Sequence, residues 1–106
     1  MAVFYVDKLF QALPQGKQAK RHGKFWCHLW PAEATPENLK ALHDLARAIG
    51  LKESYFQTHK WFPHYDLTPS KRLLAIGQGA IEKDLCEWIE EKGGLKALHQ
   101  QQKGDD

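Results

Sequence analysis

The chain has 106 residues, the length of one ordinary domain, with 42% hydrophobic and 26% charged residues. Its formal net charge of +2 is only mildly basic, and no apolar run reaches the length that would cross a membrane. The composition therefore predicts a single domain over residues 1–99, followed by a polar tail at 100–106.

The two cysteines, Cys27 and Cys86, are far apart and show none of the close spacings of metal or redox motifs. They are predicted to be buried free thiols in a reducing compartment. The apolar run at the N-terminus has five residues, which is too short for the core of a signal peptide. A cytoplasmic location without membrane contact is expected.

The first elements in chain order are strands separated by a loop. Residues 2–6 (AVFYV) are β-branched and aromatic, which favours a buried strand that ends at Asp7. Residues 11–24 contain Pro14, Gly16, Gly23 and several basic residues, which is typical of a surface loop. Residues 25–30 (FWCHLW) alternate as a strand, with His28 and the two tryptophans on one face.

The clearest element is a helix at about residues 36–49. Thr35 is a suitable N-cap, Pro36 suits the first helical position, and leucines follow at helical spacing. Gly50 stands where a left-handed residue commonly ends a helix.

The second half of the chain continues the alternation of strands and helices. We expect a strand at 51–57, a loop at 58–67, a short helix from Thr68-Pro69 to Ile76, a strand at 80–82 and a helix at 84–92. This order predicts an α/β fold with a small, mostly parallel sheet flanked by helices.

Polar residues follow several of these predicted elements. In a parallel sheet, ligands bind beyond the carboxyl ends of the strands, where helix N-termini also point. Asp7, residues 57–59 and residues 68–70 are expected to meet at that edge.

The strongest local signal is HYDLTPSKR at 64–72. Lys71 and Arg72 lie in the first turn of a predicted helix, where cations are unfavourable, and an anion bound there with Ser70 would resolve the conflict. The alternative is that Asp66 forms a salt bridge with one of these cations.

The histidines allow two kinds of chemistry. His64, beside Tyr65 and Asp66, would be a general acid or base, as would His28. A metal ion is the alternative, because Asp7, His28, His43, His64 and Asp66 carry suitable nitrogen and oxygen ligands. His22, His59 and His99 are predicted to be ordinary surface residues.

A set of short motifs runs in order along residues 3–82: YVD (5–7), WCHL (26–29), Leu42-His43, IGL (49–51), FQ (56–57), HYD (64–66), KR (71–72) and Gly79-Ala80. Through them the chain resembles an uncharacterised bacterial and phage family, domain of unknown function 4031. It departs from that pattern in the longer basic loop at 11–24 and at 31–33. The resemblance implies no established activity, and it indicates which polar residues to rank as site candidates.

The leading hypothesis is a site for a phosphate-bearing small ligand, such as a nucleotide derivative, which the protein binds or hydrolyses. Its candidate ligand-binding residues are Asp7, His28, His43, His64, Tyr65, Asp66, Ser70, Lys71 and Arg72. One alternative is a nucleic-acid-binding accessory module that uses the basic residues at 17–24. Another is a phage or bacterial protein–protein adaptor with a Trp-rich face. Catalysis, the cofactor and assembly into a homo-oligomer are left open.

Overall fold

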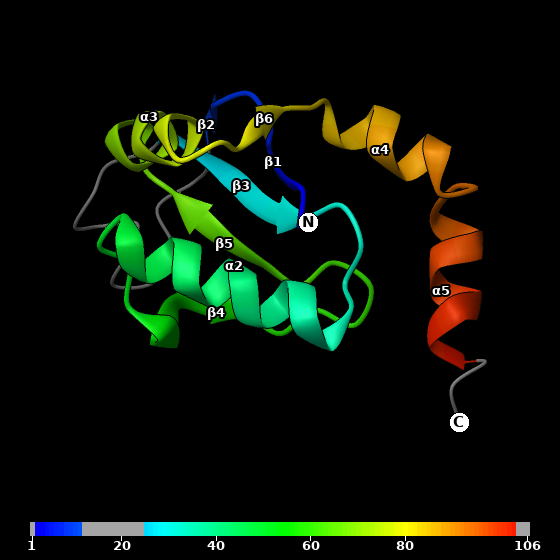
Figure 1. Cartoon of the computed structure of the whole chain (residues 1–106). Coiled ribbons are helices and arrows are strands. Elements are labelled where there is room, and N and C mark those ends of the chain that lie inside the picture. The colour runs from blue at the N-terminus through cyan, green and yellow to red at the C-terminus, as the bar shows by residue number, and fades with distance from the viewer. Residues whose placement is uncertain (1, 12–24, 104–106) are drawn as a thin grey trace.

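The computed structural model describes residues 2–11 and 25–103, which form one mixed β-sheet with helices packed on it (Figure 1). The strands are β1 (Phe4–Val6), β2 (Phe10–Gln11), β3 (Phe25–Pro31), β4 (Phe56–Gln57), β5 (His64–Leu67) and β6 (Ile81–Glu82). The helices are α2 (Pro36–Ala48), the short 3-10 helix η1 (Glu53–Tyr55), α3 (Pro69–Gly77), α4 (Leu85–Glu91) and α5 (Leu95–Lys103). The predicted loop at 11–24 lies outside the described residues except for Gln11.

The sheet is mostly antiparallel, so the prediction of a mostly parallel sheet was wrong. Five strands lie in the order β4-β5-β3-β1-β6, and β2 pairs with the start of β3. Among the described strands only β1 and β6 pair in parallel; the other four pairings are antiparallel.

The alternation of strands and helices predicts that the two strands on either side of a helix run in the same direction. It does not predict which strands lie next to each other in the sheet. Strands β3 and β4, which flank α2, run the same way, and so do β5 and β6, which flank α3. The chain returns from β4 through residues 58–63 and places β5 between β4 and β3, as an antiparallel partner of both. Each helical crossover therefore joins strands that are not adjacent.

An irregularity separates β1 from β2 along the same side of β3. Val6 pairs with Leu29 and Phe10 pairs with Trp26, so three residues stand opposite two. This is the arrangement of a β-bulge, which bends a strand and re-aims a side chain. Asp7 is the first residue of the bulge, directly after β1.

Helix α2 forms where the sequence predicts it. The Thr35 side chain accepts a hydrogen bond from the Asn38 N–H, and Gly50 has a φ of +87°, as expected for the residue that ends the helix. Thr68 caps α3 in the same way, by accepting from the Lys71 N–H. Both predicted helix starts are confirmed.

Other predictions in the second half need correction. The strand expected at 51–57 is interrupted by η1 at Glu53–Tyr55, and only Phe56–Gln57 form a strand. The loop expected at 58–67 contains β5, a central strand of the sheet. Helix α5 was not predicted, and it runs into the segment that was expected to be a polar tail.

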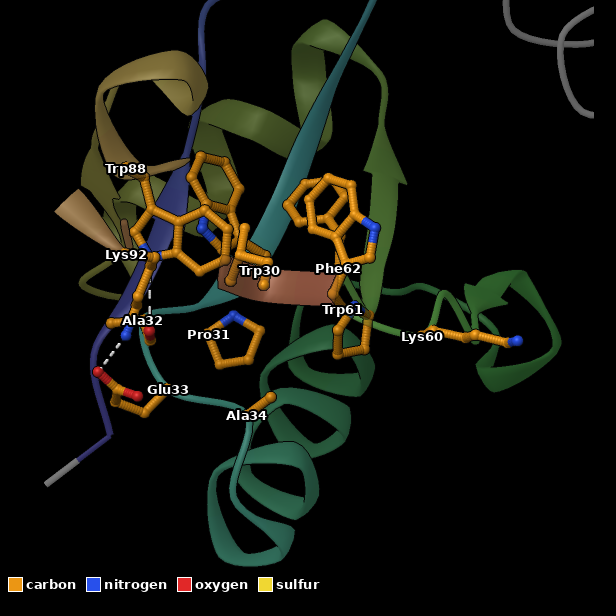
Figure 2. Close-up of a pocket in the computed structure, with 12 residues that line it drawn as sticks. Trp30, Pro31, Ala32, Glu33, Ala34, Lys60, Trp61, Phe62, Trp88 and Lys92 are labelled. Carbon is orange, nitrogen blue, oxygen red and sulfur yellow. Dashed lines mark hydrogen bonds and ion pairs between the residues drawn. The ribbon is translucent and has the colours of Figure 1, made fainter. Parts of the chain in front are cut away.

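The two faces of the sheet carry separate apolar clusters. On one face, Leu42 and Ala46 of α2 pack on Cys27, Leu29 and other buried residues of the sheet. On the other face, Trp30 and Phe62 pack against Trp88 of α4 and Leu98 of α5. These aromatic residues line a small cavity of about 80 Å³ (Figure 2).

Trp30 is only 1% exposed, so the chain's own α4 and α5 cover much of the Trp-rich face that was considered as an adaptor surface. Within the described residues, no helix combines the length and the apolar character needed to cross a membrane.

Candidate functional site

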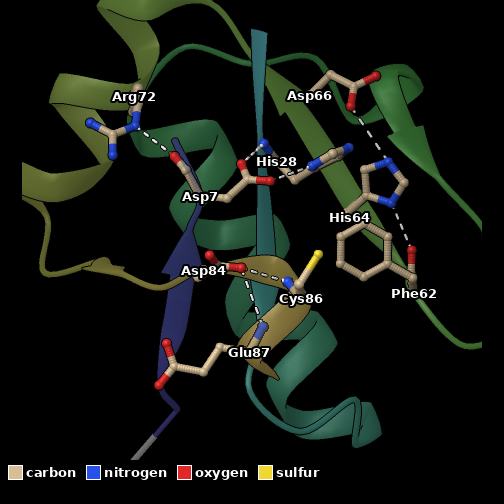
Figure 3. Close-up of polar contacts among 9 residues, drawn as sticks. All are labelled: Asp7, His28, Phe62, His64, Asp66, Arg72, Asp84, Cys86 and Glu87. Atoms are coloured by element: carbon tan, nitrogen blue, oxygen red, sulfur yellow. Dashed lines mark hydrogen bonds and ion pairs between the residues drawn. The ribbon is translucent and has the colours of Figure 1, made fainter. Parts of the chain in front are cut away.

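The candidate site lies on the face of the sheet that carries α4 and α5, at the centre of strands β3 and β5. His28 of β3 is the direct cross-strand partner of Asp66 of β5. Because side chains alternate along a strand, His64 shares the face of Asp66, while Tyr65 and Leu67 enter the core on the opposite face. Two antiparallel strands thus bring together residues that are 38 positions apart (Figure 3).

Asp7 orients His28 with both of its carboxylate oxygens. The backbone N–H of His28 donates to Oδ1 at 2.6 Å, and Nδ1 of the ring lies 2.7 Å from Oδ2. A carboxylate only accepts, so Nδ1 carries the hydrogen and Nε2 of the neutral ring keeps its lone pair. The second ring nitrogen points toward His64 and Asp66 (Figure 3).

His64 is oriented in the same sense by a backbone carbonyl. Its Nδ1 donates to the carbonyl oxygen of Phe62 at 2.6 Å, and its ring stacks on the Phe62 ring with a centroid separation of 4.4 Å. The Nε2 atom then lies 3.4 Å from Oδ1 of Asp66. The ring is only 12% exposed, so its orientation is fixed by packing as well as by the hydrogen bond.

Three electron-pair donors therefore converge: one ring nitrogen each of His28 and His64, and a carboxylate oxygen of Asp66. When both imidazoles are neutral, no N–H group lies between these three atoms. One ligand atom each of His28, His64 and Asp66 lies within 4.8 Å of the other two. Such atoms repel one another unless a proton or a metal ion lies between them. Two ligands about 2.1 Å from a tetrahedral zinc ion lie roughly 3.4 Å apart, which matches the separation of His64 Nε2 and Asp66 Oδ1.

The two cations of the 64–72 segment do not contact His64 or Asp66 and make their bonds to other groups of the fold. Arg72 donates from Nε to the carbonyl oxygen of Asp7 at 2.8 Å and pairs with Glu82 at 3.1 Å. The Lys71 ammonium donates to the Ile49 carbonyl at 2.7 Å, at the C-terminal end of α2. It therefore satisfies a helix end.

Ser70 is exposed, with its hydroxyl 3.3 Å from that of Thr68. An anion held by Ser70, Lys71 and Arg72 stays a prediction, although the bonds of both cations are made within the fold. The alternative salt bridge to Asp66 is not formed, because Lys71 and Arg72 make their bonds to other groups.

His43 and Tyr65 form a separate pair on the opposite face of the sheet. The Tyr65 hydroxyl and His43 Nδ1 share a hydrogen bond of 2.8 Å beside Phe56. Burial raises the pKa of Tyr65, with a further contribution from the negative charge of Glu53. These two predicted site residues do not join His28, His64 and Asp66.

The two cysteines differ in environment. Cys27 is fully buried, and burial, with the nearby Asp7 carboxylate, raises the pKa of its thiol to about 12. Cys86 is exposed, so the prediction that both thiols are buried was wrong. Cys86 lies in the first turn of α4, and Trp88 is the one residue of this helix that is buried. Neither cysteine forms a disulfide.

A groove of about 340 Å³ adjoins His28. It is lined by Asp7, Lys8, Leu9, Phe10, His28, Asp84, Leu85 and Cys86. The Phe10 ring stacks on His28 with a centroid separation of 5.0 Å and an interplanar angle of 24°. Phe10, Asp84 and the Phe62 carbonyl were not among the predicted site residues, and of these only Asp84 had a sequence signal, as an N-cap.

The sequence predicts that Asp7, residues 57–59 and residues 68–70 meet at one edge of the sheet, and the structure brings only some of them there. Strands β1, β5 and β6 run the same way, so Asp7, Thr68 and Asp84 follow them at the same end of the sheet. Strand β4 runs the opposite way, so residues 57–59 leave from the other end. His59 and His99 are exposed, as predicted, while His22 and the basic residues at 17–24 lie outside the described residues.

Fold and site define a small α/β protein with a cluster of two histidines and one carboxylate. The family model described as "Protein of unknown function (DUF4031)" matches residues 14–92. This is most of the chain, which therefore belongs to that family. No curated protein and no solved structure matches the chain.

Proposed function

We propose that this protein binds a divalent transition-metal ion through His28, His64 and Asp66, and uses it to bind a phosphate-bearing small ligand. The observation that carries the proposal is the convergence of the two imidazoles on Asp66, each with its Nδ1 already hydrogen-bonded. Metal-ligating histidines are oriented in this way by a carboxylate or a carbonyl on the other ring nitrogen.

The charge of the site explains why a metal is part of the proposal. Asp7 and Asp66 contribute two carboxylates, while Arg72 and Lys71 make their bonds to Asp7 O, Glu82 and Ile49 O. A phosphate would be repelled by these carboxylates, whereas a divalent cation would be attracted and would then offer open positions to phosphate oxygens. Three protein ligands leave such positions open, also for a water molecule that hydrolyses a phosphate ester.

The proposal includes that the protein works in a reducing environment, the cytoplasm. The two free thiols, one of them exposed beside the groove, support it.

The test is a titration of chelator-treated protein with Zn²⁺, followed by calorimetry and by the metal content after dialysis. We expect one ion per chain and a rise in Tm, because an ion that binds only the folded state stabilises it. Asp66→Asn and His64→Gln should weaken Zn²⁺ binding by at least about a hundredfold, and Asp7→Asn by about ten- to a hundredfold.

The matched controls are Asp44→Asn and His59→Gln, which make the same changes at exposed positions. They should bind Zn²⁺ like the wild type. Equal binding by all variants, or no binding by the wild type, would contradict the proposal.

A further inference from the structure

The groove beside His28 has the features of a pocket for the organic part of the ligand. Its volume of about 340 Å³ lies at the lower end of the range for small-molecule pockets, about 300–1,000 Å³. Leu9, Phe10 and Leu85 give it apolar walls, and Asp7, Lys8, His28, Asp84 and Cys86 give it polar groups. His28 belongs to both the groove and the metal-type cluster, so the two are continuous.

Phe10 gives the groove an aromatic surface. It is a large apolar side chain that remains 38% exposed, although it stacks on His28. The backbone of Phe10 is held by its pairing with Trp26, a buried residue of β3, and the ring lies against His28. An ordered, partly exposed aromatic ring is a surface on which a flat heteroaromatic group stacks.

Asp84 supplies a hydrogen-bond acceptor to the groove. Its Oδ1 accepts the N–H groups of Cys86 and Glu87, which holds the carboxylate at the start of α4 (Figure 3). No described residue donates to its Oδ2. A carboxylate in this position accepts hydrogen bonds from hydroxyl or amino groups and disfavours a second phosphate nearby.

We infer that the ligand is a nucleoside monophosphate, with its phosphate on the metal, its base against Phe10 and its hydroxyl or amino groups toward Asp84. The inference rests on the proposed metal site, because the ion is the group that binds the phosphate. One phosphate and one uncharged heteroaromatic group match a metal-type cluster that adjoins a groove lined by an aromatic ring and a carboxylate acceptor.

The experiment compares three probes on zinc-loaded protein by calorimetry: AMP, ribose 5-phosphate and inorganic phosphate. We expect AMP to bind at least about tenfold more tightly than ribose 5-phosphate, the effect expected of one stacked base. Phe10→Ala, loaded with Zn²⁺, should remove that difference. Phe25→Ala is the matched control, since Phe25 is also exposed and β2-paired but lies on the opposite face of β3.

The outcomes separate the inference from the proposed function. If AMP and ribose 5-phosphate bind zinc-loaded protein equally well, the nucleoside pocket is refuted while metal-dependent phosphate binding stands. If Zn²⁺ binds but none of the three probes does, both the pocket and the phosphate ligand are refuted. If Zn²⁺ itself does not bind, the proposed function fails and the inference fails with it.

Discussion

Neighbouring residues of strand β3 face in opposite directions, so that one strand contributes side chains both to the core and to the candidate site. His28 lies between Cys27 and Leu29, which are both fully buried on the opposite face. The Asp7 carboxylate reaches His28 only because the bulge after β1 breaks the regular pairing and leaves the His28 N–H to be satisfied by a side chain.

The Cys27 thiol predicts a pH dependence of stability. Its pKa in the folded chain is about 12, against an ordinary value of 9.0, so the folded state keeps the proton longer than the unfolded state. The stabilisation is complete below about pH 9 and is lost as the pH rises toward 12. The free energy of unfolding should therefore decrease by up to about 1.4 kcal/mol per pH unit in this range.

Urea unfolding under reducing conditions, from about pH 8 to pH 10, measures this slope. Cys27→Ala should flatten it, whereas Cys86→Ala, which keeps Cys27, should retain it. An identical slope in wild type and Cys27→Ala would show that the thiol titrates alike in both states.

At the scale of elements, the end of α2 depends on Gly50. Its φ of +87° is unfavourable for any residue with a Cβ, and a Cβ there would lie 2.8 Å from the Lys71 ammonium that caps the helix. Gly50→Ala should lower the free energy of unfolding by about 1–2 kcal/mol.

Gly77→Ala is the matched control in α3, where φ is ordinary and a Cβ meets nothing within 4 Å. It should be neutral or stabilise the protein by up to about 1 kcal/mol. Urea unfolding measures both changes. Equal effects at the two glycines would mean that the backbone conformation at Gly50 is not what ends the helix.

The elements that could be predicted from sequence are those with local signals. Helices α2 and α3 have an N-cap threonine followed by proline, and β3 has regular alternation. Strand β5 has the same alternation in HYDL, but with four residues after Pro63 it was taken for a loop. Strand neighbours depend on tertiary pairing, so the sheet order could not be predicted.

The candidate site could also be predicted only in part, because local sequence signals show which residues are polar but not which strands pair. Asp7 and His28 were chosen as polar residues at predicted strands, and His64 and Asp66 as residues of a predicted loop just before a helix start. His43 and Tyr65 were placed with them because, without β5, the sequence did not show that Tyr65 faces the core. Lys71 was assigned to an anion because its partner, the Ile49 carbonyl, is 22 positions away and has no signature in sequence.

At the scale of the whole molecule, the two faces of the sheet differ in how firmly they are covered. Helix α2 buries Leu42 and Ala46 in the larger cluster, whereas α4 and α5 contribute mainly Trp88 and Leu98 to the smaller one. In Figure 1, α4 and α5 also lead away from the sheet toward the C-terminus. Segments with few buried apolar contacts open at lower free energy than the core.

Amide hydrogen exchange should therefore be faster in α4 and α5 than in α2 and β3. Mass spectrometry of peptides from exchanged protein measures this difference. Equal protection of α2 and α5 would contradict it and would indicate that the molecule opens as one cooperative unit.

The alternation along β5 also has a consequence for the fidelity of folding. If β5 slipped by one residue against β3, Tyr65 and Leu67 would turn outward, and His64 and Asp66 would enter the layer beneath α2. A carboxylate buried there without a partner would be strongly disfavoured. The same two polar side chains that form the candidate site therefore act as a check on strand alignment, and replacing both by apolar residues would make misaligned pairings more accessible.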